Sequence, residues 1–188
     1  MKKKKGEYGY RDSMRRTRLL VTAVLAAGVL AQLLARFFTD SQAARNILTV
    51  MAILTVLPTA NMASPLLASW RYRTPPENFY QKAKPYEASC RILYDLIVTT
   101  KEYVMPMDAI AVHPQGIYAF CTAARLDMAK AEKSLNALLA SNRLELKVKL
   151  ICEEKSFWRR LESLKPVDGA GDDGRVEYAV SLLKSFSM

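Results

Sequence analysis

The sequence is poor in the residues that build metal sites and disulfide frameworks. Its 188 residues include three cysteines and one histidine, too few for a zinc finger or a zinc ribbon. Seven glycines and eight prolines exclude a collagen-like or low-complexity chain. Acidic residues are also in the minority, 18 against 28 lysines and arginines, which excludes an acidic disordered chain. A basic globular protein and a membrane-anchored protein both remain.

The position of the basic residues separates these two classes. The formal net charge of +10 arises entirely within residues 1–84, because residues 85–188 hold fourteen basic and fourteen acidic residues. A nucleic-acid-binding protein usually carries a basic face on its folded domain. We therefore expect no nucleic-acid partner. The excess positive charge instead lies beside and between apolar segments.

Residues 19–38 form the first predicted transmembrane helix. The segment LLVTAVLAAGVLAQLLARFF contains a single charged residue, Arg36. At about 1.5 Å of rise per residue it covers about 30 Å, the thickness of the hydrocarbon core of a bilayer. Arg36 lies one turn from the end of the segment, where a guanidinium can reach the headgroups. The alternative is a buried helix of a soluble protein, but such helices rarely stay apolar for this length.

Residues 47–70 form the second predicted transmembrane helix. They contain no charged residue, but Pro58 and Pro65 interrupt them. Each interior proline removes a backbone donor and crowds the preceding turn, so we expect a kink near residues 55–61. Trp70 follows at the end, where an aromatic belt lies in membrane proteins. The two predicted helices form a transmembrane hairpin.

The charge of the flanking segments predicts the orientation of the hairpin. The connecting residues 39–46 are nearly neutral, whereas residues 1–18 and 71–85 are basic. The positive-inside rule puts both basic segments in the cytoplasm and leaves residues 39–46 as a short external loop. A cleaved signal peptide over residues 1–38 is a poorer interpretation, because its charged and apolar regions are both too long. The sequence therefore predicts a multi-pass protein of the cell membrane with both termini in the cytoplasm.

The basic residues beside the hairpin allow two roles. They can contact anionic lipid headgroups, a contact of about 1 kcal/mol for each basic residue near the surface. They can also simply fix the orientation during insertion. The residues concerned are Lys2, Lys3, Lys4, Lys5, Arg71 and Arg73.

A small cytoplasmic α/β domain is predicted over residues 86–188, after a linker over residues 71–85 whose double proline stops any helix leaving the membrane. From Tyr86 to Ile97, apolar residues at three- and four-residue spacing predict a helix. Residues 98–106 leave the choice between a short strand and a loop open. Residues 108–112 and 117–122 then form the two strands of a β-hairpin. The intervening His-Pro-Gln-Gly sequence is typical of a type I turn.

The rest of the domain continues the same alternation of helices and strands. An amphipathic pattern predicts a helix over residues 125–142. Strict alternation predicts a half-buried strand over residues 144–152. Residues 156–164 fit a short amphipathic helix, residues 166–174 a loop, and residues 176–186 a terminal helix. The predicted order is helix, β-hairpin, helix, strand, helix.

Alternation on the strands and one helical stripe predict a single shared core. Its expected members are Ile110, Val112, Ile117, Tyr118, Phe120, Leu135, Leu138, Leu139, Val148 and Leu150.

The segment from Met107 to Phe120, MDAIAVHPQGIYAF, resembles the core hairpin of nuclease-related domains with a restriction-endonuclease-like fold. In that family an Asp opens one strand, and a Gly-aliphatic-aromatic run opens the next strand, which ends in Glu-x-Lys. A helix and a further strand follow, as in residues 86–152. Here Cys121, Thr122 and Ala123 stand in the place of Glu-x-Lys. Asp108 alone lacks the carboxylate partner and the lysine that a catalytic Mg²⁺ requires, so the resemblance implies a core without its active site.

The remaining reactive residues do not form a recognisable site. Cys90, Cys121 and Cys152 are expected to be buried free thiols in a reducing cytoplasm. A nucleophile pair of Cys121 with His113 is conceivable across the hairpin, but a histidine in a turn usually faces solvent. The acidic run Asp168, Asp172 and Asp173 lacks the ligand spacing of a calcium loop. The sequence therefore predicts no catalytic, cofactor-binding or metal-binding residue.

These observations favour an integral membrane protein that presents a non-catalytic cytoplasmic interaction domain to a protein partner or to a second copy of itself. Two other classes remain. One is an accessory subunit of a membrane transport assembly, because Gln32, Asn61 and the two prolines lie within the apolar segments. The other is a membrane-anchored, degenerate nuclease-like enzyme.

Overall fold

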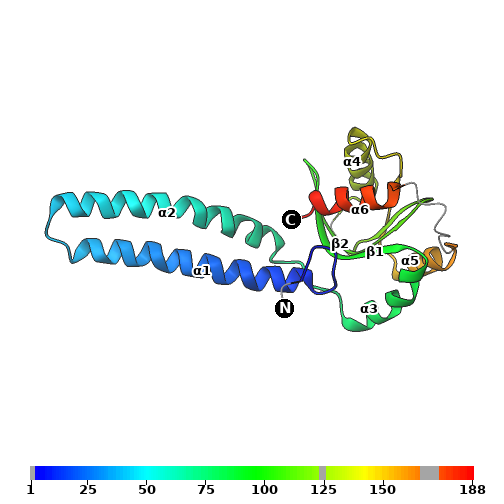
Figure 1. The fold of residues 1–188 in the computed structure, drawn as a ribbon, viewed down its shortest axis with the longest axis horizontal. Helices are drawn as coiled ribbons and strands as arrows, with labels where there is room; N and C mark the ends of the chain where they lie inside the picture. The colour runs from blue at the N-terminus through cyan, green and yellow to red at the C-terminus, as the bar shows by residue number, and fades with distance from the viewer. Residues whose placement is uncertain (1–2, 123–125, 166–173) are drawn as a thin grey trace. The chain divides into compact units, whose positions relative to one another are not determined.

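The computed structural model describes residues 3–122, 126–165 and 174–188 (Figure 1). The chain divides into two compact units. One is the helical hairpin, Asp12–Tyr72, and the other, the α/β unit, combines Met1–Arg11 with Arg73–Met188. Residues 3–11 therefore pack with the second half of the chain.

Two long apolar helices form the hairpin. Helix α1 spans Tyr10–Phe37 and helix α2 spans Gln42–Ser69, and both are long and apolar enough to cross a membrane. Helix α2 continues through Pro58 and Pro65. An interior proline leaves the carbonyl group four residues earlier without its helical N–H donor. Near the end of α2, the Ser69 hydroxyl donates to the Pro65 carbonyl at 2.7 Å.

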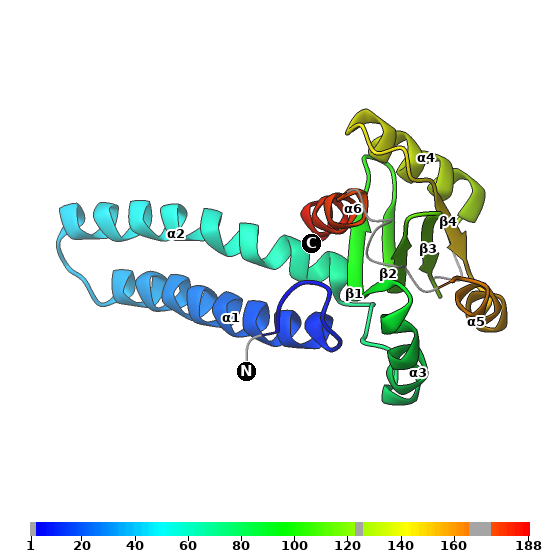
Figure 2. The ribbon, with the colours of Figure 1, turned by 45° about the vertical axis from the view of Figure 1, so that its right-hand side comes forward.

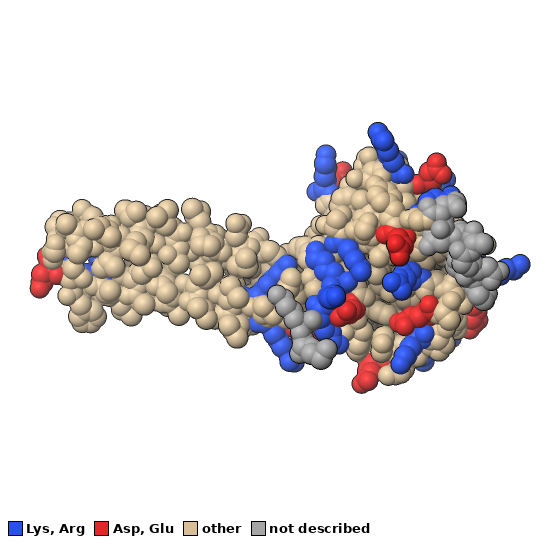
Figure 3. All heavy atoms as spheres, in the orientation of Figure 1, with Lys and Arg blue, Asp and Glu red and all other residues tan. Residues whose placement is uncertain are grey.

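The surface of the hairpin is apolar along its length. Among the described residues, all exposed large apolar side chains except Val104 and Tyr178 lie between Leu19 and Trp70. On the face drawn in Figure 3, the charged side chains of the hairpin lie at its ends. A soluble monomer rarely exposes a continuous apolar surface of this extent.

A mixed four-stranded sheet forms the centre of the α/β unit (Figure 2). Strands β1 (Arg91–Thr99), β2 (Val104–His113) and β3 (Gly116–Phe120) pair antiparallel in chain order. Strand β4 (Val148–Ile151) pairs parallel to β3. The connection from β3 to β4 contains helix α4 (Met128–Ser141), as a parallel pair requires a crossover.

Helices cover both faces of the sheet and create two cores (Figures 1 and 2). Helices α4 and α6 (Arg175–Ser185) pack on one face, where Leu135, Leu139 and Leu183 are fully buried. Helices α3 (Glu77–Ala83) and α5 (Glu154–Glu162) pack on the other. That second core is rich in aromatic rings, such as Phe79 stacked 5.3 Å from Phe120.

The predicted helix from Tyr86 to Ile97 is wrong. A short 3₁₀ helix, η1 (Lys84–Ala88), is followed by strand β1. The strand is buried on both faces from Ile92 to Val98, so its apolar residues do not alternate with polar ones. A strand of this kind cannot be distinguished from a buried helix by periodicity.

Other elements agree with the sequence patterns. The β-hairpin of β2 and β3 is confirmed, and so are the helices predicted over residues 156–164 and 176–186. Helix α4 begins at Met128, and Arg125, the predicted start, lies outside the described residues. The predicted loop 166–174 lies outside them too, except for Gly174.

The prediction of one shared core is wrong for two residues and too strong for a third. Tyr118 and Phe120 belong to the aromatic core on the opposite face from Ile117, because successive residues of a strand point to opposite faces. Leu138 is only partly buried. Burial alternates from Leu144 to Leu150 as predicted, but strand pairing is confined to β4.

The outer edge of β1 is covered by both ends of the chain. Near its start, the Tyr94 N–H donates to the Gly6 carbonyl at 2.9 Å. Near its end, the Thr99 N–H donates to the Phe186 carbonyl at 3.0 Å. A covered edge resists pairing with a strand of another chain.

The outer edge of β4 is covered by side chains of α4. The Asn136 side chain makes the two hydrogen bonds to Val148 that a neighbouring strand would make. Its amide donates to the Val148 carbonyl at 2.9 Å, and its oxygen accepts from the Val148 N–H at 2.7 Å. Glu132 accepts from the Leu150 N–H at 2.8 Å. Both edges of the sheet are thus occupied at these positions.

Candidate functional site

A buried arginine joins the N-terminal segment to the sheet of the α/β unit. Arg11, in the first turn of α1, is only 6% exposed. Its guanidinium donates to Asp108 Oδ1 at 2.7 Å and to the carbonyl groups of Leu96 at 3.1 Å and Met107 at 2.5 Å. It also donates to the Arg73 carbonyl at 3.0 Å. Four of its hydrogen bonds therefore end on β1, β2 and the start of the linker.

Two aspartates face each other across the β1–β2 ladder beside this guanidinium. The pairs on either side of Asp95 and Asp108 are aligned in the register, which places the two opposite each other. Asp95 adopts a positive φ of 57°, an uncommon conformation that short polar residues tolerate best. Its Oδ1 lies 4.0 Å from Arg11 Nε. We call Arg11, Asp95 and Asp108 the Arg11 cluster.

The carboxylate of Asp95 is buried and accepts hydrogen bonds from two neighbouring donors. Asp95 is fully buried, and its Oδ2 accepts from the Gly9 N–H at 2.7 Å and from the Thr74 hydroxyl at 2.9 Å. Burial raises the pKa of Asp95 above its usual value, although Arg11 and these two donors act in the opposite direction. Removing a carboxylate from water favours its neutral form. The ionised form of Asp95 is therefore less favourable in this cluster than it is in water.

The Arg11 cluster joins the two chain segments that make up the α/β unit. Residue 11 is the last of the first segment of the α/β unit, and residue 73 is the first of its second segment. One guanidinium holds them together and also binds the centre of the sheet. Arginine suits this role because it remains charged when buried and donates in several directions at once. The arrangement is a structural joint.

Asp108, the acid singled out by the sequence, is used within this joint. Its Oδ1 accepts from Arg11, and its Oδ2 accepts from the Thr122 hydroxyl at 2.6 Å. Asp108 borders a pocket of about 260 Å³ that also contains Glu154, itself 3.7 Å from Lys82. Among the described residues, no group of three or more His, Cys, Asp or Glu could hold a metal ion.

His113 is not the solvent-facing turn residue that we expected. It is 4% exposed, its Nε2 lies 3.1 Å from the Lys165 carbonyl oxygen, and its Nδ1 accepts from the Gln115 N–H. The hairpin register pairs His113 with Gly116 at the turn, whereas Cys121 follows the opposite end of β3. The conceivable Cys121–His113 pair is therefore not formed.

The three cysteines differ in their surroundings. Cys90 and Cys121 are buried and form no disulfide, as predicted, but Cys152 is exposed. Cys152 follows the end of β4, where the alternation that predicted its burial no longer applies. Burial, with a smaller contribution from Glu87, raises the pKa of Cys90 to about 11. Because the thiolate is the reactive form, Cys90 is a poor nucleophile at neutral pH.

The residues in the place of Glu-x-Lys are only partly described. Thr122 bonds to Asp108, Cys121 is buried, and Ala123 lies outside the described residues. The resemblance to nuclease-related domains stays a prediction. The acidic run Asp168, Asp172 and Asp173 also lies outside the described residues.

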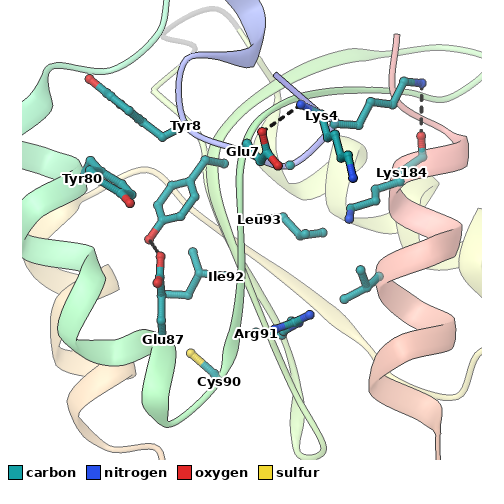
Figure 4. Close-up of a pocket in the computed structure, with 14 residues that line it drawn as sticks. Lys4, Glu7, Tyr8, Tyr80, Glu87, Cys90, Arg91, Ile92, Leu93 and Lys184 are labelled. Carbon is teal, nitrogen blue, oxygen red and sulfur yellow. Dashed lines mark hydrogen bonds between the residues drawn. The ribbon is translucent and has the colours of Figure 1, made fainter. Parts of the chain in front are cut away.

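A second site, which sequence reasoning missed, lies at the outer edge of β1 (Figure 4). This β1-edge pocket, of about 320 Å³, is lined by the N-terminal segment, the start of β1 and helices α3 and α6. Its cationic members are Lys4, Lys5, Arg91 and Lys184. They come from three distant parts of the chain, so no local motif marks them.

Comparison of the chain with protein-family models, with characterised proteins and with solved structures finds no match. The sites are therefore interpreted from their own geometry. The Arg11 cluster joins two segments of the α/β unit, and the β1-edge pocket is a cavity lined by four cationic side chains.

Proposed function

We propose that the protein is an integral membrane protein whose helical hairpin anchors the α/β unit at the cytoplasmic side of a membrane, where that unit serves as a non-catalytic interaction domain. The observation that carries the anchoring is the concentration of exposed apolar side chains between Leu19 and Trp70. Such side chains are stable in lipid and costly in water.

Contacts inside the hairpin support this proposal. The hydroxyl groups of Thr49, Thr55 and Thr59 each donate at 2.8 Å to the carbonyl four residues earlier. Threonine satisfies itself in this way where no water is present. At the base of the hairpin, the Arg15 guanidinium lies 4.0 Å from the centre of the Trp70 ring, a pairing suited to the headgroup region.

The orientation follows from the basic flanks. Exposed Lys4, Arg71 and Arg73 are available to anionic headgroups. The ammonium groups of Lys3 and Lys5 donate to the carbonyl groups of Tyr8 at 2.5 Å and Ser187 at 2.6 Å. Lys2 lies outside the described residues. The positive-inside rule makes the side that carries these residues cytoplasmic.

Two features support an interaction role for the α/β unit. Asp108, the carboxylate that the nuclease-like resemblance singles out, has both oxygens engaged by Arg11 and Thr122. Its sheet edges are covered at both sides, so a partner would dock on exposed side chains rather than add a strand. The partner is a protein or a second copy of this chain.

Alkaline carbonate extraction of membranes tests the anchoring. We expect the full chain to stay in the membrane pellet, because a spanning hairpin is not released by breaking electrostatic contacts. Recovery of the chain in the carbonate supernatant would contradict the proposal.

Photo-cross-linking in cells tests the interaction. A photoreactive residue placed at exposed Lys149 or Tyr178, with buried Leu139 as the matched control, should give a discrete protein adduct at exposed positions only. An adduct of twice the chain's mass would identify self-association. Absence of any adduct from a set of exposed positions around the α/β unit would contradict an interaction domain.

One contact favours a transport accessory as the second candidate. The Gln32 amide lies 3.5 Å from the Thr55 hydroxyl, joining the two helices within the apolar segments. A purified enzyme assay separates both candidates from the nuclease-like alternative: Mg²⁺-dependent DNA cleavage by the full chain, lost in Asp108→Asn, would contradict a non-catalytic role.

A further inference from the structure

The β1-edge pocket carries more positive charge than its own acids can balance. Four cationic side chains line it, together with Glu7 and Glu87. In Figure 4 the side chains of Lys4 and Lys184 point toward the same space in front of Leu93. Like charges that line one small pocket repel each other, and an anion bound between them offsets this repulsion.

The two acids of the pocket are already engaged elsewhere. Glu87 Oε1 accepts from the Tyr94 hydroxyl at 2.8 Å, and Glu7 Oε2 accepts from the backbone N–H of Lys4 at 2.9 Å (Figure 4). The ion pairs of the described residues involve none of Lys4, Arg91 and Lys184. These three cations therefore have no carboxylate within 4.0 Å in the part of the chain that the structure describes.

The fourth cation, Lys5, is engaged by backbone carbonyl groups. The Lys5 ammonium donates to the carbonyl groups of Ser187 at 2.6 Å and Lys184 at 3.3 Å. A cation at the end of α6 is favoured by the helix dipole. This contact ties the N-terminal segment to α6 and closes one side of the pocket.

Gly6 permits the close approach of the N-terminal segment. Its φ is +89°, and an added Cβ would lie 2.9 Å from Leu93 Cδ2 and 3.1 Å from Lys184 Cε. The Gly6 carbonyl accepts from the outward N–H of Tyr94. Because alternate residues of a strand direct their N–H groups to the same edge, the N–H of Ile92 is directed to the pocket as well.

We propose that the β1-edge pocket binds a small phosphomonoester, with Lys4, Arg91 and Lys184 contacting the phosphate. The four cations and two acids that line the pocket leave a net charge of +2, which balances a phosphate dianion. Arginine binds phosphate through two parallel hydrogen bonds. The volume of about 320 Å³ leaves room for a small organic group attached to the phosphate. The pocket lies wholly within the α/β unit, so this proposal does not depend on the proposed membrane anchoring.

The phosphomonoester can come from solution or from a lipid headgroup such as that of phosphatidic acid. The test uses the full chain in phosphatidylcholine nanodiscs and titrates glycerol 3-phosphate by calorimetry, with glycerol as the uncharged control. We expect binding of glycerol 3-phosphate, no binding of glycerol, and a higher Tm for the complex. Absence of binding to phosphate in solution and in lipid would overturn the proposal.

Matched variants separate this site from general electrostatic attraction. Arg91→Gln and Lys184→Gln should each weaken binding about tenfold, as expected for loss of a charge-assisted hydrogen bond. Lys149→Gln removes an exposed lysine on β4 and should leave the affinity unchanged. An equal loss in all three variants would overturn the proposal, and so would no loss in the first two. The Tm of each variant without ligand confirms that it is folded.

A second nanodisc composition identifies the source. If the headgroup is the ligand, nanodiscs containing phosphatidic acid should raise the Tm of the native chain and block glycerol 3-phosphate, and Arg91→Gln should reduce both effects. If the ligand is soluble, phosphatidic acid should leave the affinity for glycerol 3-phosphate unchanged. An effect of phosphatidic acid that persists in full in both Arg91→Gln and Lys184→Gln would overturn binding in this pocket.

Discussion

Arg11 Nη1 donates to Asp108 Oδ1 across 2.7 Å, although the two residues are 97 positions apart in the chain. The same nitrogen donates to the Arg73 carbonyl. One buried side chain therefore ties the sheet to both chain segments of the α/β unit. The stability of the α/β unit should depend strongly on this contact.

Arg11→Met should destabilise the α/β unit by about 3–5 kcal/mol, because it leaves two buried carboxyl groups without their cation. Unfolding of the full chain in detergent, followed by the fluorescence of Trp158 in a Trp70→Phe background, measures the loss. Arg16→Met is the matched control, since Arg16 is an exposed residue of the same helix. Similar losses in the two variants would contradict the role of Arg11.

Asp108→Asn should partly rescue Arg11→Met. The double variant has one uncompensated buried carboxyl group fewer, and the asparagine oxygen can still accept from the Thr122 hydroxyl. The same unfolding assay gives a double-mutant cycle, in which we expect a coupling energy of about 1–3 kcal/mol. Additive losses would mean that the two side chains do not interact in the folded protein.

The raised pKa of Asp95 predicts a specific dependence of stability on pH. The folded protein holds the Asp95 proton at pH values where the unfolded chain, with the usual pKa of 3.8, has released it. The contribution of Asp95 is thus fully present below the unfolded pKa and is lost as the pH rises through the folded pKa. We expect the Tm of the native chain to gain on that of Asp95→Asn as the pH falls from neutral toward 3.8. A difference that stays constant or shrinks over this range would show that the pKa is not raised.

Leu139→Ala should destabilise the α/β unit by about 2–5 kcal/mol, because the side chain is fully buried between α4 and the sheet and its loss leaves a cavity. Leu138→Ala should have a smaller effect, since Leu138 is only partly buried. Exposed Lys147→Ala should leave the unfolding midpoint nearly unchanged. The order of these three midpoints checks the orientation of α4, and a larger effect for Leu138 than for Leu139 would contradict it.

Local patterns were sufficient for some of the fold. The hairpin is visible in the sequence because length and apolar composition alone define it. Helix α5 and strands β2 and β3 follow from periodicity and from the His-Pro-Gln-Gly turn. Strand β1 was mistaken for a helix because both of its faces are buried, which removes the alternation that identifies a strand.

Both sites depend on contacts between distant residues. The Arg11 cluster has one sequence signal that could have been used: Asp95 and Asp108 each interrupt an apolar run that forms a strand, and a buried carboxylate requires a donor. Nothing in the sequence identifies Arg11 as that donor among the basic residues of the N-terminal region. The β1-edge pocket combines Lys4, Arg91 and Lys184, whose proximity follows only from the pairing of Gly6 with Tyr94 and the packing of α6.

Labelling of Cys152 with a membrane-impermeant maleimide tests whether a membrane hairpin holds the α/β unit on the cytoplasmic side. Cys152 is exposed, whereas Cys90 and Cys121 are buried, so the native chain carries one accessible thiol among its cysteines. In intact cells Cys152 should stay unlabelled and should react fully after permeabilisation, while an Asp40→Cys substitution in the connecting loop should add a thiol that reacts without permeabilisation. Labelling of Cys152 in intact cells, with Asp40→Cys protected, would contradict the account.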